Sequence, residues 1–573
     1  MITPMTRYSF ILLHGDKEKF LTELQRLGVV DITRSAKPVD NYSQDLLDNI
    51  GTLRRDIDCA RKGRDGTLDE LEAGRDALLK EMQDIAPWGE YEQQRLAAFG
   101  LHYYSVAARK FDPAWEEQYA LQVAEEKDGT VWFVIVGDAA GFPLKALPAP
   151  QHTPAALAAE LRHQEEKIAV HRKILEGRRA DIPQMVREIE RLQTELDRYL
   201  AGLTAVPAAE DTLDTLVGFA PSESDAAVTE ALEKAGVFYI RDAASAEQDP
   251  PIQLKNNKFV RMFEVLTDMY GRPAYDGFDP TPFIAVFFLL FFAMCMGDAG
   301  YGLVLILAGL ALKKVDGFRD MAPLVTVLGA ATVVVGFFLH TFFSLDIAQW
   351  PCFAGIRGIF LPDEIAGYAG GMVLSLIVGV VHLCLAMVVK AVGAVRLHGF
   401  SASLGTLGWT LLIVGGVIVG GIALTGVLSA AAVRWTVIVL GVVSALGIFV
   451  FNDPKRNKLA NVGMGLWDTY NTVTGLLGDV LSYLRLYALG LAGAMLGMAF
   501  NDMGRMVLGD GSNAVLWILF ILLVLIGHTL NIAMCALGAF VHPLRLNFLE
   551  FFKNSGYEGS GRKFNPLSNT NNK

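Results

Sequence analysis

The sequence predicts an α-helical membrane domain of eight transmembrane helices, the last two long and tilted, behind an N-terminal cytoplasmic arm of α/β lobes and a coiled-coil hairpin. Three observations support this prediction. Of the 573 residues, 52% are hydrophobic and only 19% are charged, which is unusual for a soluble enzyme. Residues 1–280 carry 33 Lys/Arg and 48 Asp/Glu, a net charge of −15, whereas residues 281–573 carry 17 and 13, a net charge of +4. Long apolar segments occur only in the second half.

Short strand-like runs predict small α/β lobes in the arm, which we expect to span residues 1–255. A β-rich run at 8–13, a helical stretch at 17–27 and a second run at 29–33 are typical of a βαβ-type unit. Further strand signals lie at 101–107, 130–137, 212–219 and 237–241. The acidic charge of this half argues against a nucleic-acid partner.

Two periodic stretches predict the hairpin, with helices at about 41–85 and 155–200. In the first stretch apolar residues step by four and three, at Leu46, Ile50, Leu53, Ile57 and Ala60. In the second an apolar residue recurs every seven positions, at Leu161, Ile168, Leu175, Ile182, Ile189 and Leu196. Such spacing is typical of a helix packed along a partner helix, although Pro183 is expected to kink the second one. The simplest arrangement is an antiparallel coiled-coil hairpin with a lobe at each end. We expect this rod to dock partner proteins as well as to separate the lobes.

The chain carries none of the common hydrolase or nucleotide-binding motifs. The patterns GxxxxGK[ST], HExxH and GxSxG are absent. The five cysteines form no CxxC pair and no metal-ligand spacing. We therefore predict no catalytic residue, metal site or cofactor on this chain, and any ATP used by its system is expected to be hydrolysed on another chain.

Eight apolar segments predict a transmembrane domain over residues 281–553, joined to the arm by a membrane-interface linker at 256–280. The segments lie at about 281–297, 300–312, 322–344, 369–395, 403–428, 433–451, 472–501 and 514–546. The first two are short for a membrane span and the last two are long. An even number of spans returns the tail, residues 554–573, to the side of the N-terminus.

Loop charges indicate which side that is. On the side of the N-terminus, the loops and the tail of the membrane half carry Lys313, Lys314, Arg319, Lys390, Arg396, Lys455, Arg456, Lys458, Lys553, Arg562 and Lys563. The opposite loops hold only Arg357, Arg434 and Arg505. By the positive-inside rule both termini are cytoplasmic, and the first 20 residues show no signal peptide. The prediction is a multi-pass protein of the cell membrane.

Intramembrane charges mark the candidate functional residues. Between 473 and 500 the only charged groups are Asp479 and Arg485. An arginine at mid-span costs several kcal/mol even on lenient scales, so it is normally retained for a function. Arg485 ends a small or polar stripe at helical spacing that begins at Asn471 and includes Ser482. A stripe of this kind is usually only a packing surface, and the arginine at its end favours a functional face.

The last apolar segment carries a second polar face. His528, Asn531, Cys535, Gly538, His542 and Arg545 step by three and four along a helix that is otherwise apolar. Either histidine alone would more often be a satisfied buried group than a proton carrier. Six positions in one register predict a face that lines water or contacts a charged partner, because lipid would leave it unsatisfied.

These residues carry a resemblance to a known family. Residues 478–496, GDVLSYLRLYALGLAGAML, resemble the seventh transmembrane helix of subunit a of V-type ATPases, called subunit I in the A/V-type enzymes of archaea and bacteria. Residues 254–283, the motif MGDAGYG at 296–302 and residues 540–567 agree with the same family. The resemblance covers the chain from about residue 250 onward. The first 250 residues resemble the family in architecture more than in motif.

The resemblance implies a membrane stator of a rotary ATPase. Its membrane domain would abut a rotating ring of proteolipid subunits, each with a mid-membrane carboxylate, and lie in membrane lipid. Its arm would bind peripheral stalk subunits E and G, and a central-stalk or ring adaptor is a further possible partner. The family's essential arginine corresponds to Arg485 and its second arginine to Arg545. H⁺ or Na⁺ would pass through two offset half-channels.

One departure from the family affects the half-channel residues. Some members carry a glutamate where this chain has Cys535. The candidates that remain are His528, Asn531 and His542 on the last helix, together with Asp479, Ser482, Glu550 and Asp298. Asp298 could equally belong to a structural turn between the first two spans. The identity of the ion and the direction of the machine stay open, and the compact arm indicates a prokaryotic enzyme.

Two other functions compete with the stator. A free-standing ion-coupled secondary transporter with a regulatory arm would usually show internal repeats with paired broken helices, and none is evident. A membrane-anchored coiled-coil scaffold without transport would leave Arg485 and the polar face of the last segment unexplained. Co-purification of a small, very hydrophobic proteolipid would favour the stator.

Overall fold

A computed structural model describes residues 1–34, 39–89, 99–139, 141–150, 152–210, 212–315, 317–319, 321–427, 429–451, 458–509 and 514–568. The chain forms two compact units. Unit 1 contains Met1–Leu12, Val29–Ile32 and Thr215–Pro566, and unit 2 contains Leu13–Gly28, Thr33–Asp214 and Leu567–Lys573. The predicted domain boundaries at 255, 280 and 553 are not tested by this division and stay predictions.

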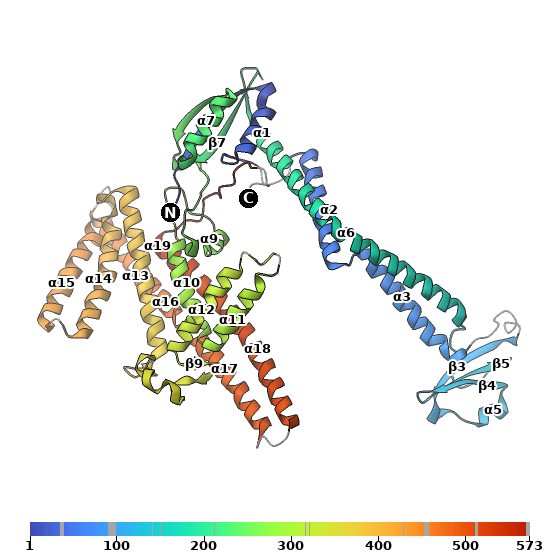
Figure 1. Cartoon of the computed structure of the whole chain (residues 1–573). Helices are drawn as coiled ribbons and strands as arrows, with labels where there is room; N and C mark the ends of the chain where they lie inside the picture. Colours follow the sequence, from blue (N-terminus) through green and yellow to red (C-terminus); the bar gives the residue numbers. More distant parts are fainter. Residues whose placement is uncertain are drawn as a thin grey trace. The chain divides into compact units, whose positions relative to one another are not determined.

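Unit 2 is built on a helical hairpin, as expected, but its first arm is two helices and not one helix over 41–85. The helices are α2 (Asn41–Lys62), α3 (Gly66–Ile85) and the 49-residue α6 (Pro154–Gly202), which lies along both and continues through Pro183 (Figure 1). Gly63, with φ +64°, ends α2 in the left-handed region, and the Asp65 carboxylate caps α3 by accepting from the Leu68 N–H.

Apolar clusters show that the hairpin is antiparallel. Residues from the start of α2 pack against the end of α6 in a cluster of Leu46, Ile50, Ile57, Ile189, Leu192, Leu196 and Leu200. Leu68 of α3 packs against Ile168 and Leu175. The periodicity in the sequence therefore identified most of the residues of this seam, although Leu161 and Ala60 lie in neither cluster.

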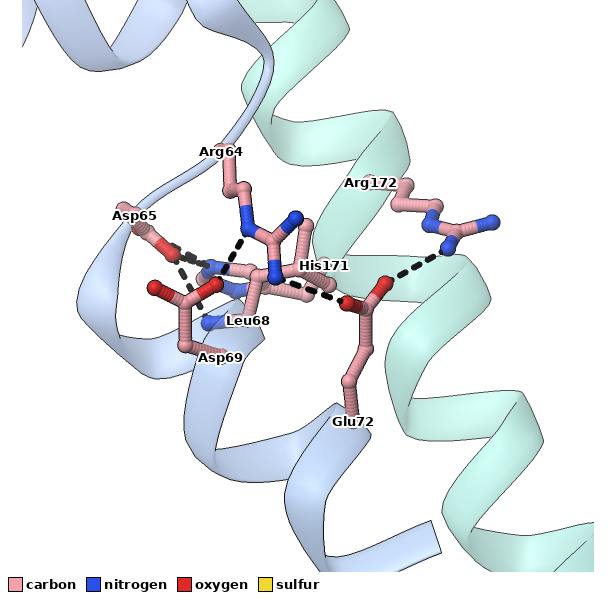
Figure 2. A network of polar contacts seen from close by, with 7 residues as sticks. All are labelled: Arg64, Asp65, Leu68, Asp69, Glu72, His171 and Arg172. Carbon is pink, nitrogen blue, oxygen red and sulfur yellow. Dashed lines mark hydrogen bonds and ion pairs between the residues drawn. The ribbon is translucent and has the colours of Figure 1, made fainter. Parts of the chain in front are cut away.

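Polar contacts hold α6 against the interruption between α2 and α3 (Figure 2). His171 Nε2 lies 2.9 Å from Asp65 Oδ1, and Glu72 accepts from both Arg64 and Arg172. Arg179 donates to the carbonyl oxygens at the end of α2, Ala60 O at 2.9 Å and Arg61 O at 3.1 Å. These are helix-terminal carbonyls that would otherwise lack a partner.

The remainder of unit 2 contains a small sheet and one further long helix. Strands β3 (Leu101–Ala107), β4 (Leu121–Lys127) and β5 (Thr130–Val136) form an antiparallel sheet in the order β3-β5-β4, with the short helix α5 (Ala114–Gln118) beside it. Phe133, fully buried, lies at the centre of an aromatic core. The strand β4 was not predicted, since its charged residues mask the alternation. Helix α1 (Lys17–Leu27) contacts α6, where Gln25 Nε2 donates to Thr194 O at 2.7 Å.

A second sheet has the order β2-β7-β1-β8. Its strands are β1 (Met5–Leu13), β2 (Asp31–Ile32), β7 (Leu213–Pro221) and β8 (Phe238–Ala243), with helix α7 (Asp225–Ala235) between the last two in sequence; β6 (Val206–Ala208) precedes β7. Strands β1 and β8 pair antiparallel with Tyr8 opposite Arg241. The two strands of the expected βαβ-type unit, β1 and β2, are not neighbours in the sheet, because β7 lies between them.

The predicted apolar segments are helices within the described residues. Short linker helices α8 (Lys258–Arg261) and α9 (Glu264–Tyr270) precede them. The apolar helices are α10 (Thr281–Met296), α11 (Ala299–Leu312), α12 (Ala322–Phe338), α13 (Gly370–His398), α14 (Leu404–Thr425), α15 (Ala430–Ala445), α16 (Lys458–Ser482), α17 (Leu484–Leu508) and α18 (Ala514–Arg545). Five helical stretches are long and apolar enough to cross a membrane, and α10, α11 and α12 are shorter. The count of eight spans is therefore not confirmed.

Short elements complete this half of the chain. The loop between α12 and α13 forms two small hairpins, β9 (Thr341–Phe342) with β10 (Leu345–Asp346) and β11 (Glu364–Ile365) with β12 (Tyr368–Ala369). A π-helical turn over Leu546–Phe551 and the short helix α19 (Phe552–Ser555) extend α18. Beyond them, the C-terminal segment runs along the linker: Ile252 N–H donates to Arg562 O at 2.6 Å, and Gly561 N–H donates to Arg272 O at 2.9 Å.

The core of the membrane half is aromatic and lies where α10 meets α13, α17 and the end of α18. Phe288, Phe291, Tyr483, Leu486 and Phe551 are each fully buried in it. The segment expected at 472–501 is interrupted inside this core: α16 ends at Ser482 and α17 begins at Leu484. The interruption places Arg485 in the first turn of a new helix.

Candidate functional site

The junction of α16 and α17 brings together most of the predicted polar residues. Arg485 is half-buried, and its Nη1 is buried without a hydrogen-bond partner among the described residues. Its charge acts on Cys295 at the end of α10 and on His542 of α18. A guanidinium with an unpaired buried nitrogen is costly inside one chain, which favours a partner outside it.

Helix α18 and its π-helical extension contribute three more of the predicted residues. His542 is half-buried with an unpartnered Nδ1, and Glu550 is 4% exposed with an unpartnered Oε2. Arg545 is exposed, and its charge acts on both His542 and Glu550. His542 thus lies within electrostatic reach of both predicted arginines.

Asp479 and Ser482 lie on α16, beside Glu550. The Ser482 hydroxyl donates to Gly478 O at 3.0 Å and also interacts with Glu550. Asp479 accepts from Asn554 Nδ2 at 2.8 Å and pairs with Lys553 at 3.6 Å. A cavity of about 400 Å³ adjoins Asp479, between residues of α13, α14, α16 and α19. Its polar lining residues include Lys390, Thr406, Thr410, Asp468, Asn471 and Lys553, and Met387, Trp409 and Leu476 line its apolar part.

His528 and Asn531 belong to a different environment, a buried network whose hydrogen bonds are satisfied. His528 Nδ1 lies 2.8 Å from the Tyr301 hydroxyl of α11, and its Nε2 lies 3.0 Å from Asn501 Oδ1 of α17. Asn531 Nδ2 donates at 2.8 Å to both the Tyr301 hydroxyl and Gly493 O. The Tyr301 oxygen accepts from Asn531, so the Tyr301 O–H can donate to His528 Nδ1. His528 is then a neutral imidazole with its proton on Nε2, and Nε2–H donates to Asn501 Oδ1.

Asp298 caps α11 and braces a loop. Its Oδ1 accepts from the N–H groups of Gly300 at 2.8 Å, Tyr301 at 3.1 Å and Phe343 at 2.9 Å, and its Oδ2 accepts from Ser344 N–H at 2.6 Å. The residue is 3% exposed. The sequence left open whether Asp298 belongs to a half-channel or to a structural turn, and this geometry fits the structural turn.

One pair of residues at the junction escaped the sequence analysis. His382 of α13 and Tyr483, the residue between α16 and α17, are both fully buried and share a hydrogen bond of 2.9 Å. A lone histidine in an apolar helix gives no register signal, and neither glycine nor proline marks the interruption at Tyr483. Only the packing of α13 against α17 brings the two together.

Large apolar side chains beside the junction are exposed. They lie on α16 and α17 around Arg485 and on α18 before Arg545: Leu477, Leu481, Met495, Met498, Met534, Leu537 and Val541. On a membrane domain such a surface meets lipid or the apolar helices of a partner. Within the described residues, no group of three His, Cys, Asp or Glu side chains is arranged to hold a metal ion.

Comparison with known proteins gives consistent matches. The model of the V-type ATPase 116kDa subunit family matches residues 160–316 and 468–569. The chain is 33% identical over 356 residues to A-type ATP synthase subunit I of Methanocaldococcus jannaschii, an alignment that covers 57% of this chain and 50% of that protein. It is 28% identical over 638 residues to V-type ATP synthase subunit I 1 of Treponema pallidum, covering 99% of this chain and all of that protein.

The archaeal matches are partial. The chain spans about half the length of the relatives from Methanocaldococcus jannaschii and Pyrococcus abyssi. Among solved structures, the cytoplasmic N-terminal domain of subunit I, homolog of subunit a, of V-ATPase is matched over 42% of this chain and 100% of that chain, at 16% identity and a TM-score of 0.19. A TM-score this low carries no argument about the fold.

Proposed function

We propose that this chain, which is similar to subunit I of the A-type and V-type ATP synthases, is the membrane-embedded stator subunit of a rotary ATPase. It couples H⁺ or Na⁺ translocation to rotation of a proteolipid ring, while ATP is hydrolysed or made on other subunits. The observation that carries the proposal is Arg485, a half-buried guanidinium in an apolar domain with a buried nitrogen that no described residue satisfies.

The chemistry follows from the charge of that group. A ring carboxylate that faces lipid is neutral, by protonation or by binding a cation, because burial disfavours its charged form. Beside Arg485 the opposite charge favours the ionised carboxylate, and the ion is released there. Arginine suits this role because it keeps its proton where a buried lysine could lose one. The fixed charge also repels cations that would leak between the two half-channels.

Unsatisfied polar atoms support a path for the ion on the cytoplasmic side of Arg485. His542 Nδ1 and Glu550 Oε2 are buried and unpartnered, as expected for groups that meet water or a moving partner. Ser482, Asp479 and the polar cavity beside Asp479 continue this path toward the loop cations. Arg545, exposed at the end of α18, is a second fixed charge at the same surface.

We assign the other three candidates a supporting role. His528, Asn531 and Asp298 are buried and hydrogen-bonded to protein, so they have little capacity left for water or an ion. They hold α11, α17, α18 and the β9–β10 hairpin together. The far half-channel then runs beside this network and not through it.

The arm has a mechanical role in this proposal. Its hairpin is a polar-surfaced rod without catalytic motifs, fit to bind peripheral stalk subunits E and G and to resist the torque of the rotor. A central-stalk or ring adaptor is a further partner, and both termini lie in the cytoplasm of a prokaryotic cell. A free-standing secondary transporter is the alternative, and it would purify without a proteolipid ring.

Replacement of Arg485 by glutamine tests the proposal. We expect the complex to assemble, with the ring and stalk subunits co-purifying, and ATP-driven ion uptake into vesicles to be lost. Arg505→Gln is the matched control, since Arg505 is exposed in the last turn of the same helix. Uptake at the normal rate in assembled Arg485→Gln complexes would show that the proposed role is wrong.

A further inference from the structure

We propose that His382 and Tyr483 form a socket that positions Arg485 toward the rotor. His382 is therefore a positioning residue for ion translocation, contributed by α13, a helix that carries none of the predicted path residues. The inference rests on the proposed function, because it assigns these residues a role in holding the arginine of that mechanism.

Tyr483 lies at the interruption between α16 and α17, two residues before Arg485. Its N–H donates to Val480 O at 3.1 Å, and its carbonyl accepts from Leu486 N–H at 3.1 Å, both bonds spanning three residues and not four. This local tightening changes the rotation of α17 about its axis relative to α16, since each helical residue turns the chain by about 100°. The direction of Arg485 thus depends on whether Tyr483 stays in place.

Three contacts keep Tyr483 in place. Its hydroxyl shares the 2.9 Å hydrogen bond with His382 Nδ1. Its ring packs edge-on against Phe291 at a centroid distance of 5.7 Å. Its other side fits against Gly379 of α13, where a Cβ atom would overlap the ring. Gly379 and His382, one turn apart on α13, therefore both contact Tyr483.

His382 is itself held by aromatic rings. Phe551 stacks on it with a centroid distance of 4.8 Å and an interplanar angle of 6°, and Phe287 lies at 4.2 Å. Its Nε2 is buried and has no partner among the described residues. A phenylalanine would fill this aromatic site without leaving a nitrogen unpaired, so the imidazole is best explained by its bond to Tyr483.

The socket also links Arg485 to Glu550 of the proposed path. Phe551, which stacks on His382, directly follows Glu550 in the π-helical turn. Tyr483 follows Ser482, which interacts with Glu550. Loss of the His382–Tyr483 bond would therefore loosen Arg485 and Glu550 together.

The test compares His382→Phe, Tyr483→Phe and the double variant in assembled complexes, by the ratio of ATP-driven ion uptake to ATP hydrolysis in vesicles. We expect each single variant to lower this ratio roughly tenfold, since small displacements of a positioned group have effects of that order. The double variant should be no worse than either single one, because both changes remove the same bond. His382→Asn, which can keep a hydrogen bond near the position of Nδ1, should restore most of the ratio.

Tyr301→Phe is the matched control. It removes a buried Tyr–His bond of 2.8 Å in the same domain, together with the bond that Asn531 donates to the same oxygen, away from the α16–α17 junction. We expect it to lower thermal stability and to leave the ratio within about twofold of normal. Equal losses of ratio in Tyr301→Phe and Tyr483→Phe would overturn the inference, as would an His382→Asn variant no better than His382→Phe.

Arg485→Gln separates the two proposals. If it abolishes uptake while Tyr483→Phe, which removes one oxygen atom, keeps the normal ratio, the socket is wrong and the proposed function stands. If Arg485→Gln itself keeps normal uptake, the proposed function is wrong and the socket has nothing to position.

Discussion

Replacement of Asp298 measures how far a buried carboxylate holds the start of α11 and the β9–β10 hairpin. Its two oxygens accept four backbone N–H groups, from Gly300, Tyr301, Phe343 and Ser344. Asp298→Ala leaves all four donors without an acceptor, those of Gly300, Tyr301 and Ser344 buried and that of Phe343 part-buried. At about 1–3 kcal/mol for each unsatisfied group, the loss is at least about 4 kcal/mol. That is a large part of the roughly 5–15 kcal/mol that stabilises a typical protein.

Asp298→Asn separates the bonds to the two carboxylate oxygens, because it keeps an acceptor in place of Oδ1 and loses the one in place of Oδ2. The amide oxygen can still accept the three N–H groups that Oδ1 accepts, while the amide nitrogen faces the Ser344 N–H as a second donor. One bond is lost, so we expect a loss of about 1–3 kcal/mol. Thermal unfolding of the purified chain should rank the proteins as wild type, then Asp298→Asn, then Asp298→Ala.

Two results would refute this reasoning. If Asp298→Ala unfolds at the wild-type temperature, the four bonds contribute nothing and the brace is wrong. If Asp298→Asn keeps its stability but loses ion uptake, the carboxylate acts on the ion and belongs to a half-channel. Asp502→Ala, a change at an exposed aspartate of α17, is the control for a change of charge alone.

Two further predictions concern close packing and pH. Gly490→Ala should destabilise the membrane half by about 1–3 kcal/mol, because the added Cβ would lie 2.8 Å from Met294 O. Gly416→Ala is the control and should be neutral or stabilising, because no atom lies within 4 Å of its added Cβ. Equal unfolding temperatures of the two variants would contradict this prediction. Burial raises the pKa of Asp65, but hydrogen bonds from the Leu68 N–H and from His171 outweigh it and hold this pKa below the usual 3.8. The ionised Asp65 carboxylate therefore stabilises the fold above pH 3.8, and this stabilisation is lost as the pH falls further. The difference in unfolding temperature between wild type and Asp65→Asn should be present at pH 6 and shrink toward pH 3, and a difference that grows in acid would contradict this.

The sequence predicted what depends on local composition and periodicity. Apolar runs located the helices of the membrane half, and heptad spacing located the hairpin seam, because burial of one helix face imposes both patterns. The break in the first hairpin helix was missed, although the sequence carries a signal for it: Gly63 can end a helix and Asp65 can cap the next one.

Other features depend on contacts between distant segments. The sequence predicted one polar face from His528 to Arg545, whereas the structure divides it: His528 and Asn531 bond to Tyr301, and His542 keeps an unpartnered nitrogen. The neighbouring helices decide which polar residues of α18 find hydrogen-bond partners, and the sequence of α18 alone does not show this. The interruption at Tyr483 also involves a distant segment, because Gly379 and His382 of α13 contact Tyr483 there.

The charged loop residues do not test the predicted orientation. Lys553, expected on the cytoplasmic side, pairs with Asp479 at the edge of the polar cavity. Lys455 and Arg456 lie outside the described residues. The orientation of the termini stays a prediction from the positive-inside rule.

Cysteine cross-linking in the assembled complex tests the central claim most directly. Leu481 and Ala488 are exposed on either side of Arg485, one turn before and after it, and each can be replaced by cysteine. Paired with a cysteine next to the carboxylate of a ring subunit, both should form a disulfide that stops ATP-driven ion uptake and is reversed by reduction. Leu307→Cys, exposed on α11, should form none. Cross-links at Leu307 but at neither flanking position would contradict a rotor-facing Arg485.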